Sequence, residues 1–211
     1  MVRIVTSLAF LLIAFAISGC VAPELKDPAS IHKRFGGKAP QGNVVTVCHA
    51  YECRMKTKVA LTDGDIEKLR SIMATGSKSA ESERAQAAKA IGWLEERVAP
   101  QVGTATDRGY DDFASAGDPS QTDCIDEATN ATSYLLVLQA NGLLKHNRVV
   151  GTATRGFIHG QMMHSTAVLR DDAAQQSYAV DSWIRPNGKP AVVLPLEQWF
   201  KKSYSNLDLQ G

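Results

Sequence analysis

The chain has 211 residues, of which 44% are hydrophobic and 21% are charged, a balance that suits one domain with a buried core. The formal net charge of +1 and the sequence pI near 7.7 exclude the strongly basic surface that nucleic-acid binding requires. We therefore expect no nucleic-acid partner.

Residues 1–19 have the pattern of a secretory signal peptide. A cationic start precedes an apolar run over 4–17 that is too short to span a bilayer, and two small residues stand before Cys20. The segment "ISGC" resembles the lipobox of bacterial lipoproteins, which implies that Cys20 is acylated and begins the mature chain. By the same resemblance, Val21 implies an anchor in the outer membrane, facing the periplasm. The alternative is an ordinary signal peptide with an incidental cysteine.

The segment that follows the signal has the composition of a linker. Residues 20–42 are rich in proline, glycine and charge, which predicts a lipidated tether between the membrane and the domain. Residues 43–211 then form a single domain.

The cysteines are expected to lie in an oxidising compartment, where thiols pair. Residues 44–61 predict two strands joined by a short loop, and Cys48 and Cys53 lie at the loop ends, so we expect a disulfide worth about 2 kcal/mol. With Cys20 assigned to lipid, Cys124 is left as a free thiol.

A metal site is a weaker interpretation of the same loop. The segment "CHAYEC" offers at most Cys48, His49 and Cys53, one ligand fewer than a closed structural zinc site has. We therefore expect no metal and no cofactor.

Helical and strand patterns divide the rest of the chain. Apolar spacing and capping signals predict helices over 62–75, over 79–100 with its end at Pro100, and from Thr122 or Asp123 to about residue 141, after a loop over 101–121. Three strands (148–157, 163–170 and 177–183) and a final helix near 195–204 follow. Because helices precede strands, the expected class is α+β with an antiparallel sheet.

Cys124 falls in the first turn of the predicted helix, where the helix dipole favours a thiolate. The dipole contributes only about 0.3 to 2 kcal/mol, whereas lowering the pKa from about 8.5 to about 5 requires close to 5 kcal/mol. The carboxylates of Asp123, Asp126 and Glu127 oppose ionisation. A nucleophilic Cys124 therefore needs an adjacent imidazolium, which predicts an ion pair and a lowered thiol pKa.

Strand register selects the histidine from five candidates. His32 lies in the tether and His49 in the disulfide loop, which leaves His146, His159 and His164. A four-residue hairpin loop over 171–174 places His164 directly opposite Asp181, and any even register shift keeps both on one sheet face. His159 would lie on the opposite face of the sheet from His164, because the two positions differ by an odd number of residues. We expect Asp181 to orient the His164 imidazole.

The order Cys124, His164, Asp181 resembles the transglutaminase-like cysteine proteinase superfamily. The motifs "DC", "HSTAV" and "VDSW" carry the resemblance, which covers about residues 110–200. It implies a papain/transglutaminase-like core, with the nucleophile helix packed on the sheet, and roles of nucleophile, base and orienter for the three residues. Papain-like enzymes also use a glutamine before the cysteine in the oxyanion hole, a role that would fall to Gln121. The backbone N–H of Cys124 is the other donor.

These expectations describe an envelope-anchored thiol enzyme that attacks an amide or acyl bond. We expect a peptidase or amidase that acts on protein or peptidoglycan-stem peptides, with the membrane as partner through the lipid anchor. One alternative is acyl transfer by a transglutaminase or transpeptidase. The other is a non-catalytic envelope lipoprotein that uses the same fold for binding.

Overall fold

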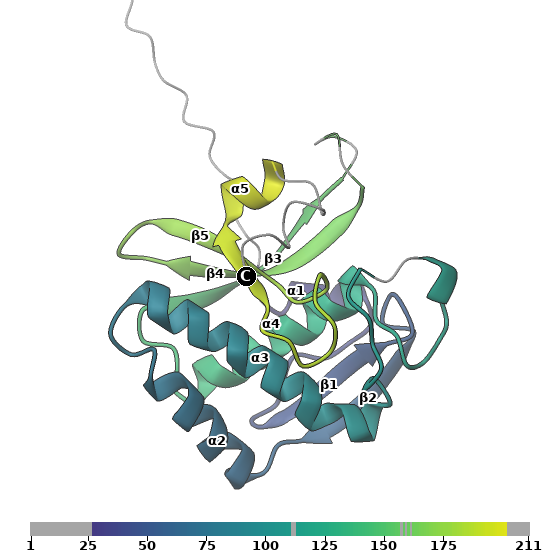
Figure 1. The fold of residues 1–211 in the computed structure, drawn as a ribbon, viewed down its shortest axis with the longest axis horizontal. Helices are drawn as coiled ribbons and strands as arrows, with labels where there is room; N and C mark the ends of the chain where they lie inside the picture. The colour runs from purple at the N-terminus through teal and green to yellow at the C-terminus, as the bar shows by residue number, and fades with distance from the viewer. Residues whose placement is uncertain (1–26, 111–112, 157, 159, 161, 202–211) are drawn as a thin grey trace, which may run out of the picture.

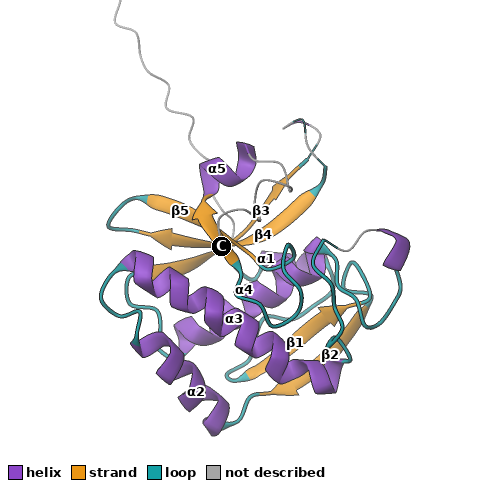
Figure 2. Cartoon of the chain, in the orientation of Figure 1, coloured by secondary structure: helices purple, strands orange, loops and turns teal. Residues whose placement is uncertain are grey.

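The computed structural model describes residues 27–110, 113–156, 158, 160 and 162–201. In chain order the elements are α1 (Ser30–Arg34), β1 (Val44–His49), β2 (Met55–Ala60), α2 (Asp63–Ala74), α3 (Ala80–Val102), the short 3-10 helix Phe113–Ser115, α4 (Cys124–Ala140), β3 (Asn147–Arg155), β4 (His164–Asp171), β5 (Gln176–Asp181), β6 (Val192–Pro195) and α5 (Leu196–Lys201). Figures 1 and 2 show helices and two separate sheets. The predicted α+β class is confirmed, with two antiparallel sheets.

Helix α4 is central to the fold. It packs against β1 of the two-stranded sheet, against β3, β4 and β5 of the four-stranded sheet, and against α3 (Figure 1). Most of its side chains are buried, because an element enclosed on several sides has no face left for solvent. The helix that begins at Cys124 is therefore held in place by both sheets.

Three helices begin with the capping boxes that their sequences encode. The side chains of Thr62, Ser79 and Asp123 each accept the backbone N–H three residues on, in α2, α3 and α4 respectively. Helix α3 does not end at Pro100 as expected; it continues to Val102. The left-handed Gly103 then ends the helix, because its φ of 96° suits glycine.

Part of the expected tether is folded. Helix α1 lies within residues 20–42, and its Ile31 and His32 are buried. His32 Nε2 lies 2.8 Å from the Ser133 hydroxyl on α4. The expectation that residues 20–42 are a tether is therefore wrong for this stretch. The segment has the overall composition of a linker, yet Ile31 and His32 within it pack against the domain. The signal peptide and Cys20 lie outside the described residues.

The four-stranded sheet has the order β3-β4-β5-β6. The first three strands confirm the predicted runs, whereas β6 was not expected, since its four residues follow a Pro- and Gly-rich loop. In the β4–β5 hairpin, Asp171 pairs with Gln176 and Arg170 with Ser177. The predicted register was therefore wrong by two residues, because the loop spans 172–175 and Gln175 adopts a left-handed φ of 53°.

Two apolar clusters lie on opposite faces of this sheet. One joins α2, α3 and α4 to the sheet, and the other collects Val168, Ala179, Ile184 and Trp199 on the far face. His164 has the same strand parity as Val168, and Asp181 the same as Ala179, so both lie on the second face. The even register error left this placement unchanged.

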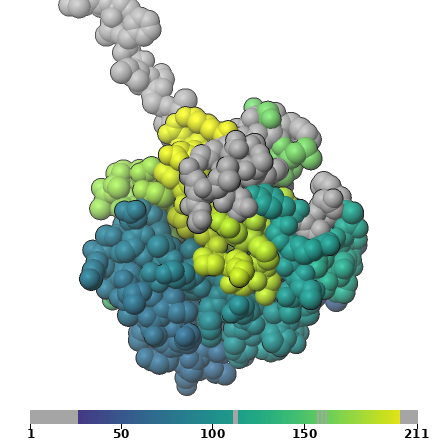
Figure 3. Space-filling model, viewed as in Figure 1, coloured from purple at the N-terminus to yellow at the C-terminus, as the bar shows by residue number. Residues whose placement is uncertain are grey.

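The segment after β5 reaches the molecular surface. Figure 3 shows it in yellow-green between the blue helices α2 and α3 and the teal segment that precedes α4. A Cβ on Gly92 of α3 would lie 2.8 Å from the carbonyl oxygens of Gly188 and Lys189, so the glycine permits this close approach. Within the described ranges, no helix has the length and apolar character needed to cross a membrane.

Candidate active site

Cys124 is the first residue of α4 and is the free cysteine of the described chain. The N-cap residue Asp123 accepts hydrogen bonds from the backbone N–H groups of Ile125 (3.0 Å) and Asp126 (2.8 Å). The N–H of Cys124 itself makes no hydrogen bond to any described residue. It is therefore a donor that a bound oxygen could use.

His164 and Asp181 form a buried pair at the second sheet face. His164 Nε2 lies 2.6 Å from Asp181 Oδ2, and both side chains are almost fully buried. With the observed register the two residues sit diagonally rather than directly opposite, because the hairpin is shifted by two. The predicted partnership of His164 with Asp181 is present in the structure.

Aromatic side chains enclose the His164 imidazole. Its ring centroid lies 4.9 Å from that of Trp183 and 5.4 Å from that of Trp199. The Trp199 indole N–H also donates to Asp181 Oδ2 at 2.7 Å. The imidazole is thus held by these tilted aromatic contacts and by Asp181 together.

A buried guanidinium supports this arrangement from the neighbouring strand. Arg155 pairs with His164 in the β3–β4 ladder, and its guanidinium lies 4.5 Å from the centre of the Trp199 ring. It also donates a hydrogen bond to the Trp199 backbone carbonyl. Arg155 thereby holds α5, and with it Trp199, against the sheet.

The Cys124 sulfur lies at the start of β4. The backbone N–H of Ser165, the residue after His164, hydrogen-bonds the sulfur, and the Asp181 carboxylate acts on the thiol electrostatically. The structure therefore brings the helix start with Cys124 to the strand end with His164 and Asp181.

Burial, followed by the charge of Asp123 and those of Asp181 and Asp126, raises the pKa of the Cys124 thiol to about 12, although the Ser165 N–H lowers it. This corrects the expected ion pair with a lowered thiol pKa. The free-energy cost of placing a thiolate among three carboxylates exceeds the stabilisation that the helix N-terminus gives to that thiolate. The resting site holds a neutral thiol.

The predicted disulfide is present, since Cys48 and Cys53 are bonded with their Cα atoms 4.5 Å apart. Residues 50–53 all have positive φ, an arrangement disfavoured for residues other than glycine. Their strained turn is held by α4: Asp126 accepts from the N–H groups of Tyr51 (2.8 Å) and Cys53 (2.6 Å), and Asp123 accepts from that of Glu52 (3.1 Å). The disulfide turn thus packs against the first turn of the nucleophile helix.

Asp126 also lies beside the two disulfide sulfurs, in an arrangement that resembles a three-ligand metal cluster. The sulfurs are bonded to each other and are not thiolates, so they lack the charge that a metal ligand needs. Burial, followed by the Asp123 charge, raises the pKa of Asp126 to about 8. The donor set fits a structural turn better than a metal.

Gln121 has a different setting from the one expected. Its side-chain amide donates to the Thr106 carbonyl (3.1 Å) and to the Ser120 hydroxyl (3.3 Å), and its oxygen accepts from the Arg108 N–H (3.2 Å). Both N–H groups of the amide are therefore used inside the loop before α4. The oxyanion role expected for Gln121 has no support from this geometry.

The other histidines lie apart from the pair. His49 binds the Pro119 carbonyl (2.8 Å) and Thr57 (3.1 Å), and His146 contacts the Ser77 carbonyl (3.1 Å). His32 is docked against Ser133. His159 lies outside the described residues.

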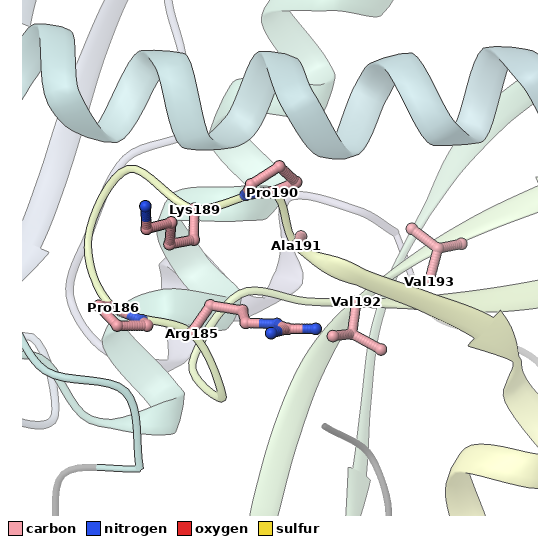
Figure 4. Close-up of a pocket in the computed structure, with 7 residues that line it drawn as sticks. All are labelled: Arg185, Pro186, Lys189, Pro190, Ala191, Val192 and Val193. Atoms are coloured by element: carbon pink, nitrogen blue, oxygen red, sulfur yellow. The ribbon is translucent and has the colours of Figure 1, made fainter. Parts of the chain in front are cut away.

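A pocket of about 380 Å³ is lined by Arg185, Pro186, Lys189, Pro190, Ala191, Val192 and Val193 (Figure 4). One of these residues, Val192, pairs with Asp181 across the β5–β6 ladder. Figure 4 shows the Arg185 side chain extending toward Val192, with Lys189 on the other side. The pocket combines apolar walls with two cations.

The residues that support the pair carry no recognisable motif in the sequence. Trp199 lies in a predicted helix without any motif, and Arg155 lies in a strand among small residues. The only signal was the alternation that places Arg155 on the same face as His164, and it needs the β3–β4 register to be useful.

No protein-family model matches the chain, and searches of curated proteins and of solved structures give no match either.

Proposed function

We propose that this protein is a thiol enzyme that attacks an amide or acyl carbon through Cys124, with His164 as base and Asp181 as orienting carboxylate. The observation that carries the proposal is the 2.6 Å bond from His164 to Asp181 at the strand end where the nucleophile helix begins. The resemblance of the Cys, His, Asp order to the transglutaminase-like superfamily supports it, and with it a papain/transglutaminase-like core.

The hydrogen bond to Asp181 determines which imidazole nitrogen acts. Because Nε2 of His164 is held by Asp181, the proposed partner of the thiol is the other ring nitrogen, Nδ1. Cys124 is neutral at rest, so its proton passes to Nδ1 as the sulfur attacks the carbonyl carbon. Base catalysis during attack thus replaces a preformed thiolate.

The tetrahedral intermediate carries its negative charge on the former carbonyl oxygen. The backbone N–H of Cys124, at the positive end of α4, is the donor for this oxygen. The imidazolium then returns its proton to the leaving amine as the carbon–nitrogen bond breaks. Water, or an amine in the acyl-transfer alternative, attacks the remaining thioester and frees the thiol.

A peptide in protein or in the peptidoglycan stem is the proposed substrate. The pocket beside Val192 would take the part of the peptide next to the bond attacked. The proposed location is the periplasmic face of the outer membrane, through a lipid on Cys20. Labelled fatty acid should enter the native protein and be lost in Cys20→Ser; labelling that survives the substitution would contradict the anchor.

The enzymatic proposal is tested with p-nitrophenyl acetate, an activated ester that needs no specific pocket. We expect a burst of nitrophenol and a stoichiometric acetyl group on Cys124 by mass spectrometry. His164→Gln should slow acylation by about 100-fold or more, the usual range for a lost general base. The matched control is His146→Gln, which changes an exposed histidine. Acetylation that proceeds equally without His164 would overturn the proposal.

The high pKa of the thiol favours a second candidate, a non-catalytic envelope lipoprotein that uses the same fold to bind peptides. A neutral, half-buried cysteine behaves as a small apolar residue and needs no partner. In that case the wild type shows no acetyl-enzyme. The p-nitrophenyl acetate experiment therefore separates the two candidates.

A further inference from the structure

Beneath the site, two buried carboxyl groups meet. Glu95 on α3 and Glu127 on α4 are 7% and 8% exposed, and their carboxyl groups lie close enough for each to act on the ionisation of the other. Two carboxylates in contact cannot both be ionised in a buried site, so the pair must hold a proton. Glu127 lies one helical turn after Cys124.

The hydrogen bonds around the pair show which carboxyl carries the proton. Glu127 accepts from the hydroxyl of Thr122 (2.9 Å) on one oxygen and from that of Ser182 on the other, as an ionised carboxylate does. Glu95 Oε2 accepts from the Gly188 N–H at 3.0 Å, while no donor from the described residues reaches Oε1. Oε1 is therefore the oxygen of Glu95 that is left to carry the proton.

The electrostatic surroundings agree with this assignment. Burial, followed by the charge of Glu127, raises the pKa of Glu95 well above its usual value. The titratable groups that face the pair are Asp107 from the loop after α3, Asp181 from β5 and the Tyr134 phenol from α4. Because none of these supplies a positive charge, loss of the proton would add a second negative charge to acidic surroundings.

The pair connects the elements that carry the proposed triad. Through Glu127 it joins the first turn of α4 to Ser182, the neighbour of Asp181. Through Glu95 it joins α3 to Gly188 in the pocket loop, where a φ of 83° suits glycine. The hydrogen bonds of this protonated pair thus connect the nucleophile helix with the residue after the orienting carboxylate and with the pocket loop.

We propose that Glu95 is a positioning residue that stays protonated at neutral pH and donates to Glu127, and so keeps Cys124 aligned with His164 and Asp181. The alignment rests on the proposed function, whereas the proton on Glu95 is a property of the folded chain. The two parts therefore have separate measurements.

The first measurement is urea unfolding between about pH 6 and about pH 8. A proton that only the folded state holds raises the unfolding equilibrium constant about tenfold per pH unit, since free glutamate is already ionised there. In Glu95→Gln the amide donates to residue 127 without titrating, so this tenfold contribution should disappear. Glu96→Gln, the exposed neighbour on the same helix, should keep the wild-type slope. Equal slopes in wild type and Glu95→Gln would overturn the proton assignment.

A second measurement needs no variant. In wild-type protein with ¹³C-labelled glutamate carboxyl groups, one carboxyl resonance should fail to titrate near the usual pKa of about 4.3 and stay protonated at neutral pH. A spectrum in which every glutamate titrates near that value would contradict the assignment, even if Glu95→Gln did not fold.

The positioning role is read from alkylation of Cys124 by iodoacetamide at one pH. Glu95→Gln keeps the hydrogen bond, so its alkylation rate should stay within about twofold of the wild-type rate. Glu95→Leu loses the hydrogen bond, so its alkylation rate should change by about tenfold from the wild-type rate, as expected for a displaced site. Equal rates in the two variants would overturn the positioning role. None of these measurements depends on ester hydrolysis, so failure of the acylation experiment would leave them interpretable.

Discussion

Trp199 donates its indole N–H to Asp181 Oδ2 at 2.7 Å, and the same oxygen binds His164 Nε2 at 2.6 Å. The other oxygen, Oδ1, has no hydrogen-bond partner within the described chain. Both donors thus fix one carboxylate oxygen from two directions, and this sets the direction in which the imidazole must point. The orientation of His164 depends on a helix that follows it by more than thirty residues.

Replacement of Trp199 by phenylalanine tests this dependence. The ring would remain as packing, but a hydrogen bond to a charged group is lost, which should lower the free energy of unfolding by about 2 kcal/mol. Urea unfolding measures the loss. Trp93→Phe, on the half-buried face of α3, is the control. A loss no greater than that of the control would mean that the indole N–H does not support Asp181.

The pairing of His164 with Asp181 could be predicted because it depends only on parity. The hairpin loop was misplaced by one residue at each end, yet a shift of two leaves both side chains on one sheet face. The α+β class and the disulfide followed from patterns equally local: alternation, capping residues and two cysteines across a short loop.

Other features depend on packing between distant segments and had no local signal. Glu95 and Glu127 are separated by more than thirty residues, and nothing in either helix sequence indicates that they meet. The thiol pKa was predicted in the wrong direction because the depth of burial of Cys124 cannot be derived from helix periodicity. The docked His32 was missed for the same reason, since its partner Ser133 lies on α4.

The Cys48–Cys53 disulfide should contribute to stability because it closes a short loop and so restricts the unfolded chain. In the chain-entropy model, the Cys48–Cys53 link is worth about 2 kcal/mol, so Cys48→Ala/Cys53→Ala should lower the free energy of unfolding, measured in urea, by that amount. Dithiothreitol should destabilise the wild type equally and leave the double variant unchanged. Peptide mapping after alkylation without reductant should find Cys124 as the one modified thiol of the mature domain. Modified Cys48 or Cys53 in folded protein would contradict the link.

The docking of α1 should depend on pH through His32. Burial lowers the pKa of His32, so the folded state disfavours its protonated form. A depressed histidine pKa contributes stability above the unfolded value of about 6.5, and that stability is lost as the pH falls below it. The contribution of His32 to the free energy of unfolding should therefore fall from pH 7 to pH 5, and the difference in stability between wild type and His32→Gln should change accordingly over this range. His146→Gln, at an exposed site, should show no such change. An unchanged pH dependence in His32→Gln would show that α1 is not held by a neutral imidazole.

The reactivity of Cys124 tests the electrostatics of the site most directly. Because burial and then Asp123 raise the thiol pKa to about 12, alkylation by iodoacetamide should be slow near pH 7 and should accelerate about tenfold per pH unit into the alkaline range. Asp123→Asn removes one of the opposing charges while asparagine remains a good N-cap, so the pKa should fall and alkylation at pH 8 should be faster. Asp118→Asn changes an exposed carboxylate earlier in the same loop and should leave the rate unchanged. Rapid alkylation of the wild type already at pH 6 would instead indicate a thiolate–imidazolium pair, and the neutral-thiol mechanism would then be wrong.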